Sequence, residues 1–174
     1  MDTVEVSTVV YLPPEEIYDF LVDFPRYTAY SEYITEVSRH GDGSPGTVYD
    51  IHVAWWKLTY TTRSQVTGVD PPRKIDWRIT KDIDAAGYWG IEEIDPPEGR
   101  EHASRVRLCI GFDADSANPT GLDLPRLVSL SWVIEKVKPL VEREAKRVTE
   151  RVVADLEGES RPVDLTVHTA PDSV

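Results

Sequence analysis

A series of short alternating segments, separated by turns of hairpin length, runs from residue 33 to residue 113. Turn-forming residues cluster in GDGSPG (41 to 46), VDPPRK (69 to 74), DIDAAG (82 to 87) and DPPEGRE (95 to 101). The segments between these turns place apolar residues at every second position, which is typical of strands with one buried face. Because such turns are too short for parallel crossovers, we predict antiparallel strands.

The alternation assigns an apolar face to each strand. Its members are Tyr49, Ile51, Val53 and Trp55, then Leu58, Tyr60, Thr62, Ser64 and Val66, then Ile75, Trp77 and Ile79, and then Trp89, Ile91, Val106, Leu108, Ile110 and Phe112. Arg63, Asp76 and Arg78 fall on the opposite face, where we expect them to pair across strands in solvent. A register slipped by one residue would instead turn these charges inward as a polar cluster with a catalytic role.

Helical patterns flank the strands. After a first strand at residues 3 to 11, LPPEEIYDFLVDFPRY predicts a helix, and a second short helix follows at about residues 25 to 30. An apolar stripe predicts a long helix from about Leu124 to Glu157. About 30 residues span roughly 45 Å, which is enough to cross a sheet. The predicted fold class is α+β: a curved antiparallel sheet of about seven strands wrapped around a long C-terminal helix, with two short helices after the first strand.

This arrangement predicts one domain over residues 1 to 157, followed by a polar, mostly loose tail over residues 158 to 174. One helix cannot fill a wide concave surface, so we expect a cavity between sheet and helix. We expect Trp89 and Ile91 to pack on the helix while another part of the same face lines the cavity.

The charge and cysteine content limit the partners. Acidic residues outnumber basic ones by 31 to 19, which gives a net charge of −12 and disfavours direct contact with nucleic acid. The acidic residues are spread along the chain, and this pattern predicts a salt-adapted, haloarchaeal source. Cys109 is the single cysteine, and no apolar run is long enough to span a membrane. We therefore expect a cytoplasmic monomer or dimer with at most transient membrane contact.

No motif specifies catalysis, a metal or a cofactor. The histidines at positions 40, 52, 102 and 168 are expected to face solvent, and none has the spacing of a zinc site. We assign no catalytic residue, no metal ligand and no cofactor. The ligand-binding residues are instead predicted from aromatic and hydroxyl side chains on the concave face and the long helix. They are Tyr30, Tyr49, Tyr60, Thr62, Trp77, Trp89 and Trp132.

Four stretches carry a family resemblance that covers about residues 3 to 157: VSTVVYLPPEEIYDFLVDFPRYTAYSEY, YTTRSQVTGVDPPRKIDW, GYWGIEEI and EREAKRVTERV. They resemble the START-like (helix-grip, SRPBCC) superfamily of polyketide cyclases, dehydrases and lipid-transfer domains, and most of all its coenzyme-Q-binding family. The resemblance implies a carrier or chaperone for an isoprenoid quinone or other lipid. Two alternatives stay open: a cyclase or dehydratase-type enzyme, and a ribosome- or protein-interaction module.

Overall fold

The structure, a computed structural model, describes residues 2–55, 58–81, 84–113, 130–159, 161–163 and 166–170. Its elements, in chain order, are β1 (Asp2–Val10), α1 (Pro14–Val22), the 3-10 helix η1 (Phe24–Ala29), β2 (Ile34–His40), β3 (Val48–Trp55), β4 (Leu58–Asp70), β5 (Lys74–Ile79), β6 (Asp84–Ile94), β7 (Ala103–Asp113), α2 (Leu130–Glu157) and β8 (Thr166–Ala170).

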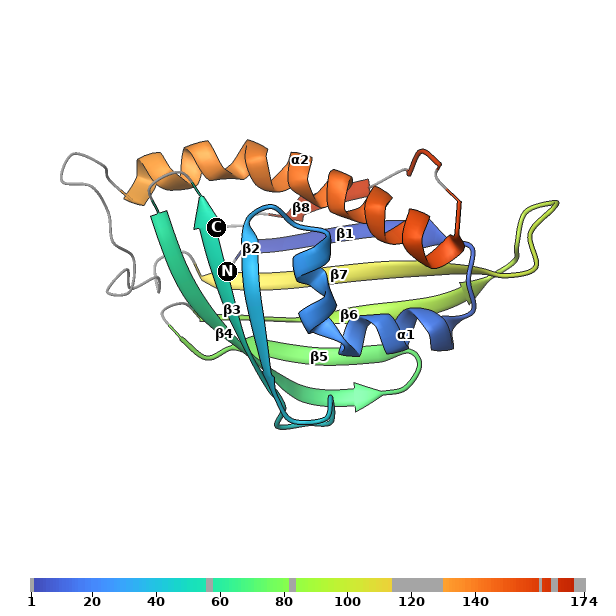
Figure 1. Cartoon of the computed structure of the whole chain (residues 1–174), viewed down its shortest axis with the longest axis horizontal. Coiled ribbons are helices and arrows are strands. Elements are labelled where there is room, and N and C mark those ends of the chain that lie inside the picture. Colours follow the sequence, from blue (N-terminus) through green and yellow to red (C-terminus); the bar gives the residue numbers. More distant parts are fainter. Residues whose placement is uncertain are drawn as a thin grey trace.

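The strands form one antiparallel sheet in the order β2-β3-β4-β5-β6-β7-β1-β8. The sheet is curved, and α2 runs along its concave side, while α1 and η1 lie under the C-terminal half of α2 (Figure 1). Strands β1 to β7, the two short helices and the long helix confirm the predicted α+β helix-grip arrangement. The sequence expectation that the long helix starts near Leu124 concerns residues outside the described part of the chain.

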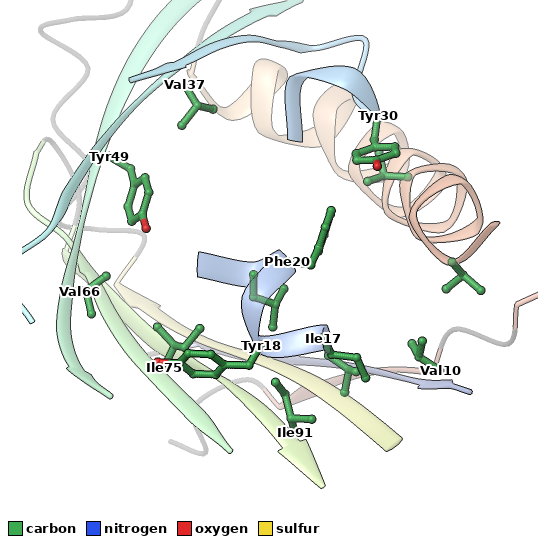
Figure 2. Packing of buried hydrophobic residues seen from close by; sticks show 14 of the residues in the cluster. Val10, Ile17, Tyr18, Phe20, Tyr30, Val37, Tyr49, Val66, Ile75 and Ile91 are labelled. Atoms are coloured by element: carbon green, nitrogen blue, oxygen red, sulfur yellow. The ribbon is translucent and has the colours of Figure 1, made fainter. Parts of the chain in front are cut away.

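The helix α1 forms where the sequence predicts it. Pro14 occupies the first turn, and Glu15 and Glu16 place negative charge at the positive end of the helix dipole. Ile17 and Phe20 recur at helical spacing and are both buried. Figure 2 shows α1 directing side chains into the interior from one side while the sheet directs Tyr49, Val66 and Ile91 into it from the other. The helix thereby covers one end of the concave face.

The register of the sheet decides which face carries charge. Asp50 lies opposite Arg63 across β3 and β4, and the Arg63 Nε atom is 2.7 Å from the Asp50 carboxylate. Asp76 pairs with Lys74 on the same outer face, where Arg78 is exposed. The predicted outward placement of Arg63, Asp76 and Arg78 is confirmed, so the slipped register and its inward polar cluster are wrong.

The segment after α2 differs from the loose tail that the sequence predicts. Residues 166–170 form β8, which pairs antiparallel with β1 from Thr3 to Ser7. Val163 is almost fully buried in the core cluster. The alternation of Val163, Leu165 and Val167 in the sequence is the signal of this ordering, and the open edge of β1 supplies the backbone hydrogen bonds that stabilise it.

A buried carboxylate fixes the C-terminal end of α2. The side chain of Glu157 is only 2% exposed, and it accepts hydrogen bonds from the Tyr11 N–H (2.8 Å) and from Arg161 Nε (2.8 Å) and Nη2 (2.9 Å). The guanidinium of Arg161 also donates to the carbonyl oxygen of Val9 and lies 4.2 Å from the centre of the Tyr11 ring. The end of α2 is thus tied to the junction between β1 and α1.

A polar stripe on α2 contacts the loop before β2. Its members are spaced by three or four residues: Glu144, Arg147, Arg151 and Asp155. Glu144 accepts hydrogen bonds from the Ser31 hydroxyl and the Glu32 N–H, and Arg147 forms an ion pair with Glu32. Arg151 donates to the carbonyl oxygen of Tyr30, and Asp155 accepts from the Tyr30 hydroxyl. Because the stripe is largely solvent-exposed, its ion pairs contribute orientation more than stability.

We predict that replacing Glu157 with Gln lowers the free energy of unfolding by about 2 kcal/mol, because an amide loses the charge-assisted bonds to Arg161. Chemical denaturation at pH 7 measures the loss. Glu159→Gln is the matched control, since Glu159 is exposed two residues further along. Equal stability of the two variants would contradict the anchoring role of Glu157.

The same carboxylate predicts a pH dependence. Burial by itself raises the pKa of the Glu157 carboxyl, but the hydrogen bonds from Arg161 and the Tyr11 N–H outweigh burial and hold the pKa below its usual value of 4.5. The stabilisation is therefore complete above pH 4.5 and is lost as the pH falls through the folded-state pKa. Acid unfolding followed by circular dichroism should show wild type losing its advantage over Glu157→Gln in that range. A constant difference down to pH 2 would contradict this prediction.

Candidate functional site

The candidate site is the concave face of the sheet beneath α2. The registers between strands place these residues on it: Tyr49, Ile51 and Val53 of β3, Tyr60, Thr62, Ser64 and Val66 of β4, Ile75, Trp77 and Ile79 of β5, Ala85, Gly87, Trp89 and Ile91 of β6, and Val106, Leu108, Ile110 and Phe112 of β7. None of these described positions carries a histidine or a carboxylate. The face is apolar with a few hydroxyl groups, as the alternation predicts.

Burial divides this face into two halves. The half beneath α1 is closed: Val66, Ile75 and Ile91 are each no more than 5% exposed. The other half holds partly exposed side chains, among them Ile79, Ile110 and the ring of Phe112. This second half lies toward the ends of the strands remote from α1. In this half of the sheet, the described residues leave part of the apolar surface uncovered and accessible to solvent.

Tyr49 lies in the closed half, at the boundary with α1. Its ring is buried and packs edge-on against Phe24, with ring centres 5.6 Å apart. Its hydroxyl donates to the carbonyl oxygen of Val22 at 2.8 Å. Burial raises the pKa of the Tyr49 hydroxyl, which therefore keeps its proton at neutral pH. That proton already has an acceptor within the protein, so Tyr49 offers a ligand its ring and a lone pair.

Tyr30 connects η1 to α2. Its side chain is buried, its ring packs edge-on against Phe20, and its hydroxyl is hydrogen-bonded to the Asp155 carboxylate. Burial raises the pKa of Tyr30, and the hydrogen bond to Asp155 raises it further. In this structure Tyr30 joins two helical segments over the interior, so its hydroxyl proton is also used within the chain.

Tyr60 and Thr62 lie on β4 in the more open half of the face. Both are partly exposed, and the ammonium group of Lys81 lies 5.7 Å from the centre of the Tyr60 ring. Lys81 also donates to the carbonyl oxygen of Thr61, which fixes the cation at the rim of the sheet. These two predicted ligand-binding residues share a strand and a face, with their side chains directed to the same side.

Trp77 and Gly87 are register partners on β5 and β6, and the indole ring lies close to the glycine. A Cβ atom on Gly87 would come within 2.8 Å of Trp77 Cζ2 and 2.0 Å of the Cys109 carbonyl oxygen. The ring therefore needs a glycine beside it. The Nε1 atom of Trp77 is buried and has no hydrogen-bond partner among the described residues. The alternation in the sequence predicts Trp77 on this face but does not single out Gly87. A glycine inside a strand pattern, here between Ala86 and Tyr88, often marks the close approach of another group, and this was the sequence feature that could have indicated the contact.

Two predicted ligand-binding residues, Trp89 and Trp132, and the four histidines remain to be placed. Trp89 is partly buried and packs against the core cluster, next to buried Ile91. Trp132 lies in the first turn of α2, but its side chain is outside the described part of the structure. His40 and His102 are exposed, as predicted. His52 lies on the convex face, also as predicted, where it is partly exposed and its Nδ1 atom is 2.7 Å from the Thr61 hydroxyl. The side chain of His168, in β8, also lies outside the described residues.

A hollow of about 240 Å³ lies on the convex face over β5, β6 and β7. Its basic lining residues are Arg73, Lys74, Arg105 and Arg107. Each of these four cations lies 4.0 Å or less from a carboxylate oxygen. Two of the paired carboxylates, Asp70 and Glu92, belong to the lining, so the lining itself carries more basic than acidic residues. Asp76 and Glu5 lie beside the hollow and complete the ion pairs of Lys74 and Arg107, which leaves each cation with a carboxylate partner.

The sequence of residues 1–157 matches the family described as "Polyketide cyclase / dehydrase and lipid transport". The chain belongs to this family. No curated protein matches its sequence. In the described part of the chain, no helix is both long enough and apolar enough to cross a membrane.

Solved structures share the fold of this family member. The Zhui aromatase/cyclase from Streptomyces sp. R1128 superposes with a TM-score of 0.65 at 20% identity, over 90% of this chain and 94% of that one. Ara h 8.0201 gives a TM-score of 0.58 at 15% identity, over 90% and 98% of the chains. TTHA0849 from Thermus thermophilus gives 0.59 at 14%, over 90% and 97%. At these identities the likeness establishes the fold, while function has to be argued from the site.

We predict that Gly87→Ala lowers the free energy of unfolding by roughly 1–3 kcal/mol, because the new methyl group would overlap a backbone carbonyl and the Trp77 ring. Gly90→Ala is the matched control on the opposite face of the same strand, where a Cβ atom would meet only the Tyr88 ring at 3.4 Å. We expect the control to change stability by less than about 0.5 kcal/mol. Thermal unfolding measures both, and equal effects would contradict the close approach at Gly87.

Proposed function

We propose that this protein binds a hydrophobic small molecule, an isoprenoid quinone or a similar lipid, between the concave face of the sheet and α2. The observation that carries the proposal is the partly exposed apolar half of that face, marked by Ile79, Ile110 and Phe112. Burying such surface against an apolar ligand is favourable by about 25 cal/mol per Å². The family description, which includes lipid transport, supports the same class of ligand.

The residue types at the described concave positions favour a protein that carries its ligand over an enzyme that catalyses proton transfer. A general acid or base acts best when its pKa lies near the working pH, and His, Glu and Asp are the usual choices. The described concave positions of β3 to β7 provide none of these. The ionisable hydroxyl of Tyr49 is held in its neutral form by burial and already donates to Val22. We therefore propose a carrier or chaperone for the ligand.

A cyclase-type activity is the second candidate, because a solved structure with the same fold is an aromatase/cyclase. In that case the concave face would orient a reactive chain, and the effective concentration of its reacting groups would supply the rate enhancement. A polyketone probe would then cyclise faster with the protein than with bovine serum albumin at equal concentration. Equal rates would eliminate this candidate and leave the carrier proposal in place.

The first test is identification of the native ligand. The protein, purified under non-denaturing conditions in molar salt that suits its acidic surface, is extracted with organic solvent and the extract is analysed by mass spectrometry. We expect a quinone or other isoprenoid lipid in near-stoichiometric amount. If neither the extract nor a titration with quinones reveals binding, the proposed function is wrong.

A bulky substitution should block the site without unfolding the chain. Thr62→Phe adds a ring to the partly exposed half of the concave face, and we expect it to raise the Kd for menadione, a naphthoquinone probe, about tenfold or more. Thr59→Phe is the matched control, because Thr59 lies on the same strand, faces outward and is exposed. Isothermal titration calorimetry measures both variants. Equal affinity of the two would place the binding site elsewhere.

A further inference from the structure

The indole N–H of Trp77 is a hydrogen-bond donor without an acceptor in the described part of the chain. Its Nε1 atom is buried, and no described residue places a hydrogen-bond partner within reach. An indole nitrogen can only donate, so the group has no second way to be satisfied. Buried polar groups in native proteins are nearly always hydrogen-bonded, and an exception calls for a specific explanation. The position of this donor, on the face proposed to hold a ligand, provides one.

The surroundings of Trp77 explain why its described neighbours supply no acceptor. Its register partners are Val66 on β4 and Gly87 on β6, and its neighbours on the same face of β5 are Ile75 and Ile79. These side chains carry no oxygen or nitrogen. The nearest concave hydroxyl along β4 is that of Ser64, which lies opposite Ile79 and makes no hydrogen bond with Trp77. A bound molecule on this face could provide the acceptor that these neighbours do not.

Gly87 determines which edge of the indole lies against the sheet. A Cβ atom there would approach Cζ2 to 2.8 Å, and Cζ2 and Nε1 are both bonded to Cε2. The edge that carries the N–H therefore lies beside Gly87. In this structure the nitrogen is covered from water, so a ligand reaches it when the ring turns about its two side-chain torsions or its covering neighbours shift. Glycine at position 87 leaves room for that movement.

We propose that the Trp77 N–H recognises a carbonyl oxygen on an otherwise apolar ligand. The inference rests on the proposed function and adds a specificity rule to it: among hydrophobic molecules of equal shape, the protein selects those with an acceptor oxygen. A quinone or ketone carbonyl fits, because it accepts a hydrogen bond without carrying charge into an apolar site. A hydrocarbon of the same shape would leave the donor unpaired.

The test compares two probes that differ in two carbonyl oxygens: menadione and 2-methylnaphthalene. Trp77→Phe keeps an aromatic ring and removes the donor. We expect this variant to raise the Kd for menadione about tenfold, because it loses one hydrogen bond to the ligand. The Kd for 2-methylnaphthalene, which has no acceptor oxygen, should change by less than about twofold. Tyr88→Phe is the control, since Tyr88 lies on the convex face of β6 and its substitution should alter neither affinity.

A spectroscopic measurement on the wild-type chain covers the case in which Trp77→Phe does not fold. The indole N–H protons of the five tryptophans are observed in a two-dimensional ¹H–¹⁵N correlation spectrum of ¹⁵N-labelled protein. Saturating menadione should move the Trp77 indole proton downfield, as hydrogen bonding does, and 2-methylnaphthalene should not. An indole proton that fails to move with menadione, or moves equally with both probes, would overturn the inference.

The outcomes separate the inference from the proposed function. If Trp77→Phe weakens both probes equally, Trp77 contributes shape alone: the specificity rule is wrong, and the proposed binding function stands. If the wild-type protein binds neither probe and yields no hydrophobic molecule on extraction, the proposed function is wrong and the specificity rule fails with it.

Discussion

The carboxylate of Glu157 connects three separate parts of the chain at one end of the molecule. It joins the last turn of α2, the segment that follows at Arg161, and the backbone where β1 leads into α1 at Tyr11. A long helix that crosses a curved sheet needs such a fixed point, because apolar packing alone is non-directional and allows a helix to slide or rotate. With the C-terminal end held there, the path of α2 over the concave face is defined.

The two sides of α2 then have different chemical roles. Residues such as Val148 and Val153 are buried in the core, whereas the stripe that includes Glu144 and Arg147 makes polar contacts with the loop before β2. Apolar contacts of this kind supply stabilisation, and the polar contacts select one orientation of the loop. The closed half of the concave face is thus filled by buried side chains, whereas the other half keeps apolar side chains that are partly exposed.

Much of this fold could be predicted from the sequence because period-two alternation encodes both strand position and strand face. The placement of Trp77 inward and Arg63 outward follows directly from that alternation. Hydrogen-bond partners could not be predicted in the same way. The Tyr30 hydroxyl meets Asp155, 125 positions further along the chain, and the Tyr49 hydroxyl meets the backbone of Val22. Alternation gives no distances between such remote groups, so it could not show which donors are already paired, or that the Trp77 N–H lacks a partner among the described residues.

The pairing of β8 with β1 also changes the edges of the sheet. With β8 in place, β1 is an interior strand, and the edges are β8, of five residues, and β2, of seven. Short edge strands offer few open backbone groups to a neighbouring molecule, which is one way in which proteins avoid edge-to-edge aggregation. A chain that lacked residues 166–170 would present the nine residues of β1 as a longer open edge. The pairing of β8 with β1 therefore reduces the length of open backbone that this edge of the sheet presents to a neighbouring molecule.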